Sequence, residues 1–191
     1  AAGGKSIQKD FFSMKFSQRI SRKLFILLLV GLLANGSALA QGSGKADKED
    51  KTKTKEAQAV SKQVYEKIVE AQEMVDAKEY QPALRLLNNL YNPDKLTEYE
   101  QANVLNYLGY IHYSMDNMRD AIATYKRLLD IPTLELQMAK QTTFTMAQLL
   151  TVEDRFQEAL TAIDQWFILE TNPAPEPFIL KAQILYNMDR F

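Results

Sequence analysis

The chain has 191 residues, with 24 acidic and 23 basic side chains and a formal net charge of −1. It contains no cysteine, which excludes disulfides, thiolate metal sites, cysteine nucleophiles and a lipoprotein anchor. The absence of a basic stripe argues against nucleic acid as a partner.

The N-terminal part predicts export. Residues 1–13 precede the first methionine, Met14, and are interpreted as an upstream extension that is not native. Residues 14–40 are typical of a signal peptide: a basic start, an apolar run over residues 24–33, and small residues up to a cleavage site after Ala40. An uncleaved membrane anchor is the alternative. Cleavage predicts a periplasmic chain without an integral membrane span. It removes six basic residues and one acid, which leaves the mature chain with a net charge of −6.

Residues 41–57 form a lysine-rich leader in which acids alternate with the lysines. This composition favours a flexible, solvated segment. A weak contact with a membrane surface or the cell wall is the alternative, although mixed charges make a poor field for it.

From residue 58 onward the apolar spacing predicts helices, and no stretch shows the alternation of a strand. A pattern of a bulky residue, two spacers, Ala and then Leu or Ile recurs, with Ala83, Ala121 and Ala159 each 38 residues apart. The expected helices cover about 60–75, 83–90, 97–115, 121–129, 133–152 and 155–169, and a seventh begins near residue 176. Thr97 and Glu100 match a capping box at the start of the third.

A constant period of this size predicts a solenoid, and helix–turn–helix units with small residues at the crossing resemble tetratricopeptide repeats. Ala71, Gly109 and Ala147 each precede the Ala of their unit by twelve residues, and Ala182 occupies the same place in the last one. We expect an all-α, right-handed solenoid of antiparallel helix pairs over residues 58–191. Its units cover about 64–95, 102–132, 140–171 and an incomplete 175–191, or about three and a half repeats. The incomplete unit suggests a chain truncated at its C-terminus, with a frayed last helix that exposes Phe178, Leu180, Ile184 and Leu185.

In such a solenoid the first helix of each pair lines the concave face. Equivalent positions there form three columns: Gln72, Tyr110, Gln148 and Gln183; Val75, Tyr113, Thr151 and Tyr186; and Ile68, Asn106, Phe144 and Ile179. From these we predict a peptide-binding groove of Gln72, Asn106, Tyr110, Tyr113, Phe144, Gln148, Gln183 and Tyr186. Amides both donate to and accept from a peptide backbone, and tyrosine adds contact area with a polar end. Ordinary polar surface is the alternative interpretation.

The columns contain no Lys or Arg, so a clamp for a partner's C-terminal carboxylate is not expected, and a neutral or basic segment suits the acidic domain better. Signals for chemistry are weak, and we expect no enzyme, metal or cofactor. His112 is the only histidine and is interpreted as a satisfied residue of the helix-pair core. Glu98 and Glu100 are interpreted as capping acids, and Trp166 as core.

The region from about Tyr65 resembles periplasmic tetratricopeptide proteins of Gram-negative bacteria that accompany TonB-type energy transduction. The resemblance is carried by residues 96–102, 106–113, 131–132, 145–149, 166–167, 172–177 and 182–183. It implies a soluble partner of a TonB–ExbB–ExbD-like complex that drives outer-membrane uptake of iron chelates. The first hypothesis is therefore a non-enzymatic adaptor that holds a protein or peptide segment of an envelope complex. The alternative is a scaffold in outer-membrane or cell-wall assembly, and an enzyme is a third hypothesis.

Overall fold

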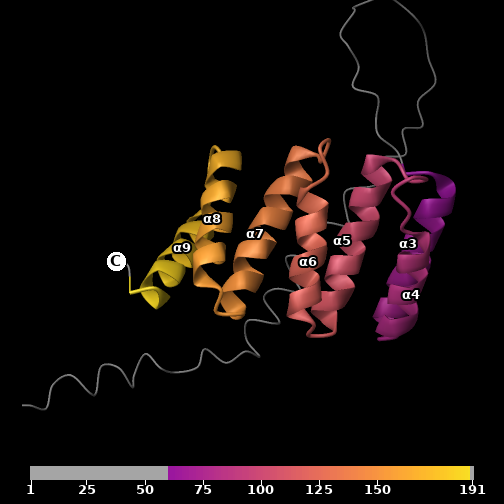
Figure 1. Cartoon of the computed structure of the whole chain (residues 1–191), viewed down its shortest axis with the longest axis horizontal. Helices are drawn as coiled ribbons and strands as arrows, with labels where there is room; N and C mark the ends of the chain where they lie inside the picture. Colours follow the sequence, from indigo (N-terminus) through magenta and orange to yellow (C-terminus); the bar gives the residue numbers. More distant parts are fainter. Residues whose placement is uncertain (1–59, 190–191) are drawn as a thin grey trace, which may run out of the picture. The chain divides into compact units, whose positions relative to one another are not determined.

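The computed structural model describes residues 60–189, and this part of the chain contains only helices and the turns between them (Figure 1). The predicted all-α class is confirmed for these residues. The predictions on the upstream extension, the signal peptide, the leader and the last two residues lie outside the described part. The helices are α3 (Lys62–Asp76), α4 (Tyr80–Leu90), α5 (Glu98–Ser114), α6 (Met118–Leu129), α7 (Leu136–Val152), α8 (Phe156–Leu169) and α9 (Pro175–Asn187).

The helix ends agree with the local sequence signals to within a few residues, and α4 and α6 each begin three residues before the expected range, at Tyr80 and Met118. The side chain of Thr97 accepts from the backbone N–H of Glu100, and the Glu100 carboxylate accepts from that of Thr97, so the predicted capping box is confirmed. Helix α7 begins at Leu136 and not near Thr133. The backbone N–H and hydroxyl of Thr133 both donate to the carboxylate of Glu98, which holds Thr133 in the turn before the helix. None of these described helices has the length and apolar character required to cross a bilayer.

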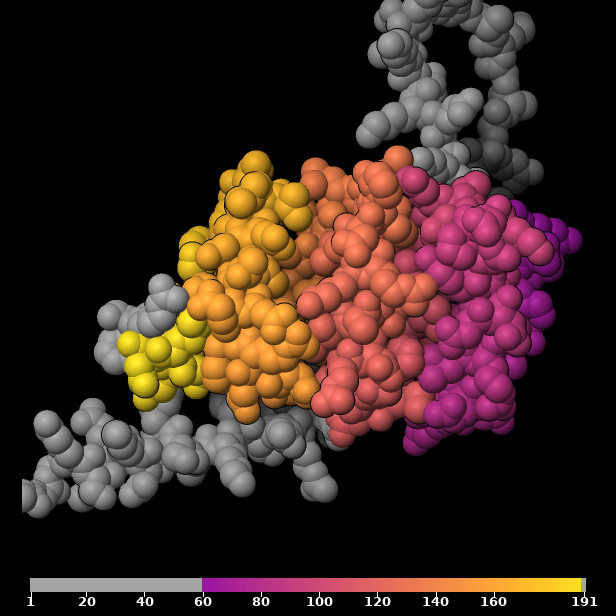
Figure 2. All heavy atoms as spheres, in the orientation of Figure 1, coloured from indigo at the N-terminus to yellow at the C-terminus, as the bar shows by residue number. Residues whose placement is uncertain are grey.

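Consecutive helices pack against each other, and α3–α4, α5–α6 and α7–α8 form pairs joined by short turns. Figure 2 shows the helices following one another in chain order, with α3 and α9 at opposite ends of the described residues. The small residues lie where the pairs cross, and the six that the pattern singled out in the three pairs are all buried: Ala71, Ala83, Gly109, Ala121, Ala147 and Ala159. Their burial shows that the recurring motif belongs to the core. A small side chain at each of these positions lets two helix backbones approach.

The crossing of α5 and α6 is the tightest example. A Cβ atom added to Gly109 would lie 2.6, 2.7 and 2.9 Å from three ring carbons of Tyr125. The ring of Tyr125 is 1% exposed and is enclosed by the core. Gly109 is therefore required because the aromatic ring of the second helix occupies the space of its missing side chain.

A second repeating feature lies at the C-terminal end of each first helix. Lys78, Asp116, Asp154 and Asp189 all have positive φ, between 52° and 65°. In the three pairs the residue with positive φ and its successor donate back to the helix, as in Lys78 N–H to Val75 O and Glu79 N–H to Met74 O. This is the Schellman arrangement, which ends a helix by satisfying its last carbonyls. The same stop thus recurs in every unit, although glycine, the usual residue there, is absent.

Helix α9 is only partly covered by the other described helices. Ile184 is fully buried, whereas Phe178 is 55% exposed and Ala182 is exposed. Leu180 and Leu185 are half-buried against the core. The expectation of exposed apolar residues is confirmed for Phe178 and wrong for Ile184, which packs inward because it lies on the side of α9 that meets the core.

Candidate functional site

The eight predicted groove residues lie on the four first helices of the units. Gln72 is on α3, Asn106, Tyr110 and Tyr113 on α5, Phe144 and Gln148 on α7, and Gln183 and Tyr186 on α9. The first six are half-buried and the two on α9 are exposed. Half-burial suits a binding residue, because the side chain is held by its neighbours and still presents polar atoms at the surface. We call this surface of α3, α5, α7 and α9 the first-helix face.

Three other members of the predicted columns do not belong to a groove. Ile68 and Val75 are each 7% exposed and form part of the core under α4. Thr151 is 9% exposed, and its hydroxyl donates to the backbone oxygen of Ala147 at 2.7 Å. At these three positions the columns therefore contain buried side chains, because each position is turned toward the second helix of its own pair. The concept of a uniform column across four units is therefore wrong at these sites.

The predicted site residue Phe144 has a structural contact as well. Its ring centroid lies 5.5 Å from that of Trp166 on α8, in a tilted arrangement. Trp166 is 9% exposed, so its prediction as core is confirmed. Phe144 therefore anchors α7 to α8 with one side of its ring, and only the remainder is available at the first-helix face.

The strongest concentration of one residue type near this face is a group of tyrosines from three helices. Burial, together with smaller contributions from the phenols of Tyr65 and Tyr110, raises the pKa of Tyr107 to about 12. Burial also raises the pKa of Tyr125 far above its ordinary value, with additional contributions from Tyr110 and Tyr113. These contributions, together with the packing of α3 and α6 against α5, group the five phenols. We call Tyr65, Tyr107, Tyr110, Tyr113 and Tyr125 the tyrosine cluster.

Sequence reasoning identified only two members of the cluster as site residues. Tyr107 was missed, although its spacing of three from Tyr110 and six from Tyr113 places all three along one stripe of α5. Tyr65 comes from α3, which packs against α5. It was missed because only the packing of the two helices joins them. Tyr65 is 62% exposed, whereas Tyr107, Tyr110 and Tyr113 are half-buried, so the cluster reaches from solvent into the core.

Tyr125 lies at the buried end of the cluster. Its hydroxyl is enclosed and has no hydrogen-bond partner among the described residues. A buried hydroxyl without a partner costs free energy, about 1–3 kcal/mol. The structure therefore leaves one polar atom unsatisfied close to Tyr110 and Tyr113, two of the predicted site residues.

Two of the first helices, α5 and α7, carry few charged side chains, whereas α3 carries six among its 15 residues. Residues 101–114 of α5 contain no Asp, Glu, Lys or Arg. Lys140 is the only charged residue of α7, and its ammonium contacts the Glu170 carboxylate at 3.1 Å. Burial raises the pKa of Glu100, but hydrogen bonds from Ser61 and Thr97 outweigh it and lower the pKa to about 2. A ligand at α5 and α7 would thus contact mainly phenols and amides.

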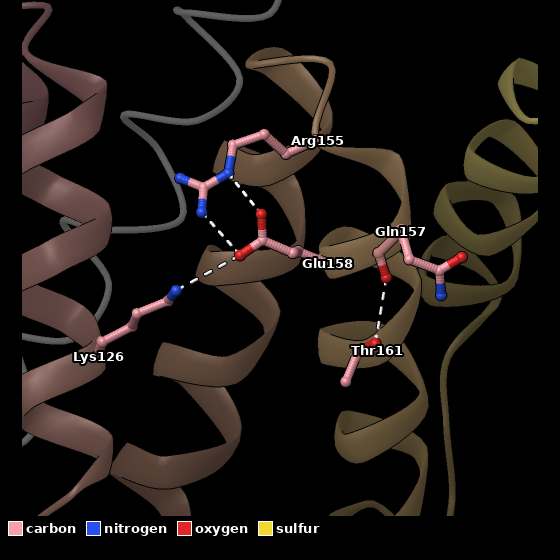
Figure 3. Close-up of polar contacts among 5 residues, drawn as sticks. All are labelled: Lys126, Arg155, Gln157, Glu158 and Thr161. Carbon is pink, nitrogen blue, oxygen red and sulfur yellow. Dashed lines mark hydrogen bonds and ion pairs between the residues drawn. The ribbon is translucent and has the colours of Figure 1, made fainter.

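The polar contacts that link the second helices are of a different kind (Figure 3). The carboxylate of Glu158 on α8 accepts from Nε and Nη2 of Arg155, each at 2.7 Å, and from Nζ of Lys126 on α6 at 3.4 Å. The nearby Thr161 hydroxyl donates to the backbone oxygen of Gln157. The bridge from α6 to α8 is exposed, so its contribution to stability is small. Charge in this region joins neighbouring units, whereas α5 beyond its first turn carries no Asp, Glu, Lys or Arg.

His112 departs from its predicted environment. It is half-buried, and its Nδ1 atom has no hydrogen-bond partner among the described residues, so the prediction of a satisfied histidine was wrong. Burial lowers the pKa of the imidazole, while Asp120 acts in the opposite direction. Within residues 60–189 no group of three or more histidine, cysteine or acidic side chains is arranged to hold a metal ion.

Comparisons with known proteins found no match to this chain among protein-family models, curated proteins or solved structures.

Proposed function

We propose that this protein is a non-enzymatic adaptor that binds a peptide segment of an envelope protein on its first-helix face. The single observation that carries the proposal is the set of half-buried tyrosine and amide side chains on α5 and α7, which carry few charged residues. Tyrosine offers a large apolar area at a low entropic cost together with a hydroxyl, and it is enriched among residues that dominate binding. Solenoids use such extended faces to hold partners.

The architecture that we propose is a right-handed tetratricopeptide solenoid of antiparallel helix pairs. Three features of the described residues support it: the buried small residues at each crossing, the helix pairs that pack in chain order, and the left-handed stop after each first helix. The residues with positive φ follow the same step as the sequence motif, at 78, 116 and 154. A repeated local geometry at a repeated sequence position is what a solenoid requires.

The cellular setting that we propose is the periplasm, in support of a TonB–ExbB–ExbD-like complex for uptake of iron chelates. It is supported by the sequence features of residues 14–40 and by the family resemblance of the repeat region. The proposal would be tested by crosslinking in cells, in which capture of motor components supports it and capture of wall-synthesis enzymes alone refutes it.

The binding surface is tested by pull-down from envelope extract with a Tyr110→Ala/Gln148→Ala double variant. Both side chains are half-buried on the first-helix face, so the expected result is loss of the captured partners. A Gln157→Ala/Thr161→Ala variant is the matched control, because both residues are exposed on α8, where the Thr161 hydroxyl donates to the backbone oxygen of Gln157. Undiminished recovery with the Tyr110/Gln148 variant would remove this face from the function.

A scaffold in outer-membrane or cell-wall assembly is the second candidate. It is favoured by exposed apolar residues on α8 and α9, where Ile168 is 80% and Ile179 is 65% exposed. Such side chains are available for association with another protein. An Ile168→Ser/Ile179→Ser variant that loses all partners, while the Tyr110/Gln148 variant keeps them, would favour the scaffold over the adaptor.

A further inference from the structure

Helix α9 has an open stripe of mostly apolar side chains at positions that are largely closed in the preceding first helix. We call this the α9 stripe, and it consists of Phe178 (55% exposed), Ile179 (65%), Ala182 (exposed) and Tyr186 (52%). The equivalent positions of α7 lie 35 residues earlier and are buried or half-buried: Thr143 (3% exposed), Phe144 (half-buried), Ala147 (0%) and Thr151 (9%). The α9 stripe therefore has the position of a helix contact, but no described helix covers it.

The helix pairs of the same chain show what fits against such a stripe. In α5 the small residue of the crossing, Gly109, lies directly under the Tyr125 ring of the second helix. In α7 the ring of Phe144 meets that of Trp166 on the second helix at 5.5 Å. The α9 stripe continues this series of interfaces at equivalent positions. Its occupant is therefore an amphipathic helix, which can approach closely because the side chain of Ala182 is small.

One described helix has these properties and is available, namely α9 of a second copy. Among the small residues at the crossing positions only Ala182 is exposed, whereas those of α3 to α8 are all buried. If two α9 helices cross in antiparallel fashion at Ala182, Phe178 of one copy lies opposite Tyr186 of the other, because each is four residues from Ala182. The stripe is thus self-complementary, as an isologous contact requires, and such a contact closes as a dimer.

The charges near the stripe do not oppose this pairing. Lys181 is the only charged residue between Phe178 and Tyr186. Its ammonium lies 2.7 Å from the Asp164 carboxylate of α8 and 5.6 Å from the ring centroid of Phe167, so it is held toward its own chain. The ring of Phe178 lies 4.8 Å from that of Phe167, centroid to centroid, which fixes its place while its other side is exposed. The stripe can therefore be covered without burying an unpaired charge.

We propose that this protein forms a twofold dimer in which the α9 helices of two copies cross at Ala182. A covered aromatic side chain buries about 150–250 Å², so the three large side chains of the half-open stripe offer on the order of 300 Å² per copy. A standard interface buries about 800 Å² per partner, and the dimer is therefore weak and reversible. This inference goes beyond the proposed adaptor function, which rests on α5 and α7.

The first test is the mass of the purified protein by sedimentation equilibrium over an about hundred-fold range of concentration. The mass should rise from one copy toward two as the concentration is raised. Ala182→Glu should abolish the rise, because two carboxylates would then meet at the twofold axis within an apolar contact. Gln157→Glu is the matched control: it adds the same charge at an exposed position of α8 and should leave the rise unchanged. Circular dichroism verifies that both variants keep their helices.

The absence of cysteine from the chain allows the contact to be located directly. Ala182→Cys introduces a single thiol, and two thiols at the twofold axis can form a disulfide, which joins Cα atoms about 4–7 Å apart. Mild oxidation should therefore trap most of this variant as a covalent dimer. Thr161→Cys is the control, because Thr161 is exposed on α8 outside the stripe, and it should give little covalent dimer under the same conditions.

Three outcomes would overturn the proposal. The first is a mass that stays at one copy throughout, with no covalent dimer from Ala182→Cys. The second is a dimer that Ala182→Glu leaves intact, since another surface would then form it. The third is a monomer that binds a labelled peptide of residues 155–170, which would assign the stripe to a helix from another source. The adaptor function is tested separately, because the pull-down variants lie on α5 and α7.

Discussion

Replacing Gly109 with alanine tests the closest helix contact in the fold. The added Cβ would lie 2.6 Å from the nearest ring carbon of Tyr125, whereas carbon atoms in favourable contact are about 3.5–4.0 Å apart. The nearest ring atom must therefore move by roughly 1 Å. Because the Tyr125 ring is 1% exposed and packed on all sides, it has no open space to enter.

Two opposing effects set the magnitude for Gly109→Ala. Overpacking of a tight core costs about 1–3 kcal/mol, and a clash of this depth belongs to the upper part of that range. Alanine in place of glycine within a helix returns about 1 kcal/mol. The expected net loss in the free energy of unfolding is about 2 kcal/mol, which lowers Tm by roughly 4–10 °C for a domain of this size.

The assay is urea denaturation followed by circular dichroism, in a double-mutant cycle with Tyr125→Leu. Leucine lacks the ring atoms that meet the new Cβ, so Gly109→Ala should become neutral or stabilising in that background, with a coupling of about 2–3 kcal/mol. Ala123→Gly on the exposed side of α6 calibrates the helix-propensity term, and it should cost about 1 kcal/mol. Equal destabilisation by Gly109→Ala in both backgrounds would refute the steric explanation.

Further predictions concern the helix ends and the buried phenols. Glu100→Gln should lower the free energy of unfolding at neutral pH by about 1–3 kcal/mol, since it removes a charged acceptor. Because the folded-state pKa of Glu100 is lowered to about 2, this contribution is present above about pH 4.5 and is lost as pH falls toward 2. An acid titration of both proteins would measure this loss. Lys78→Gly should stabilise the fold by about 1 kcal/mol, because glycine adopts a positive φ without strain. Asp154→Gly should stabilise it by less, because aspartate tolerates that conformation. Unchanged urea midpoints in both variants would contradict this. The pKa of Tyr107 is raised to about 12, so its contribution is complete below pH 10 and is lost as pH rises toward 12. The Tyr107→Phe variant should therefore lose less stability than the unchanged protein as pH rises from about 10 toward 12. Unfolding curves of both proteins at about pH 9 and pH 11.5 would test this.

The sequence by itself determined the helices and much of their packing. The apolar spacing, the capping box at Thr97 and the Ala pattern of Ala83, Ala121 and Ala159 depend on local rules, and those rules operate within a few residues of chain. The same holds for Gly109, whose position in the repeat predicts a close crossing of α5 and α6. The turn after each first helix was also visible, but its left-handed residue was not, because lysine or aspartate occupies the position where glycine usually signals it.

Only the tertiary structure decided which side chains share a surface. A position in the repeat does not specify how far each helix rotates against its neighbours, so Ile68, Val75 and Thr151 were expected in a column of surface residues and are buried instead. The tyrosine cluster was hidden for the same reason, since Tyr65, Tyr107 and Tyr125 come from three helices that are joined by packing alone. The sequence therefore determined which helices form, while the rotation and contact of those helices decided which phenols and amides make the candidate site.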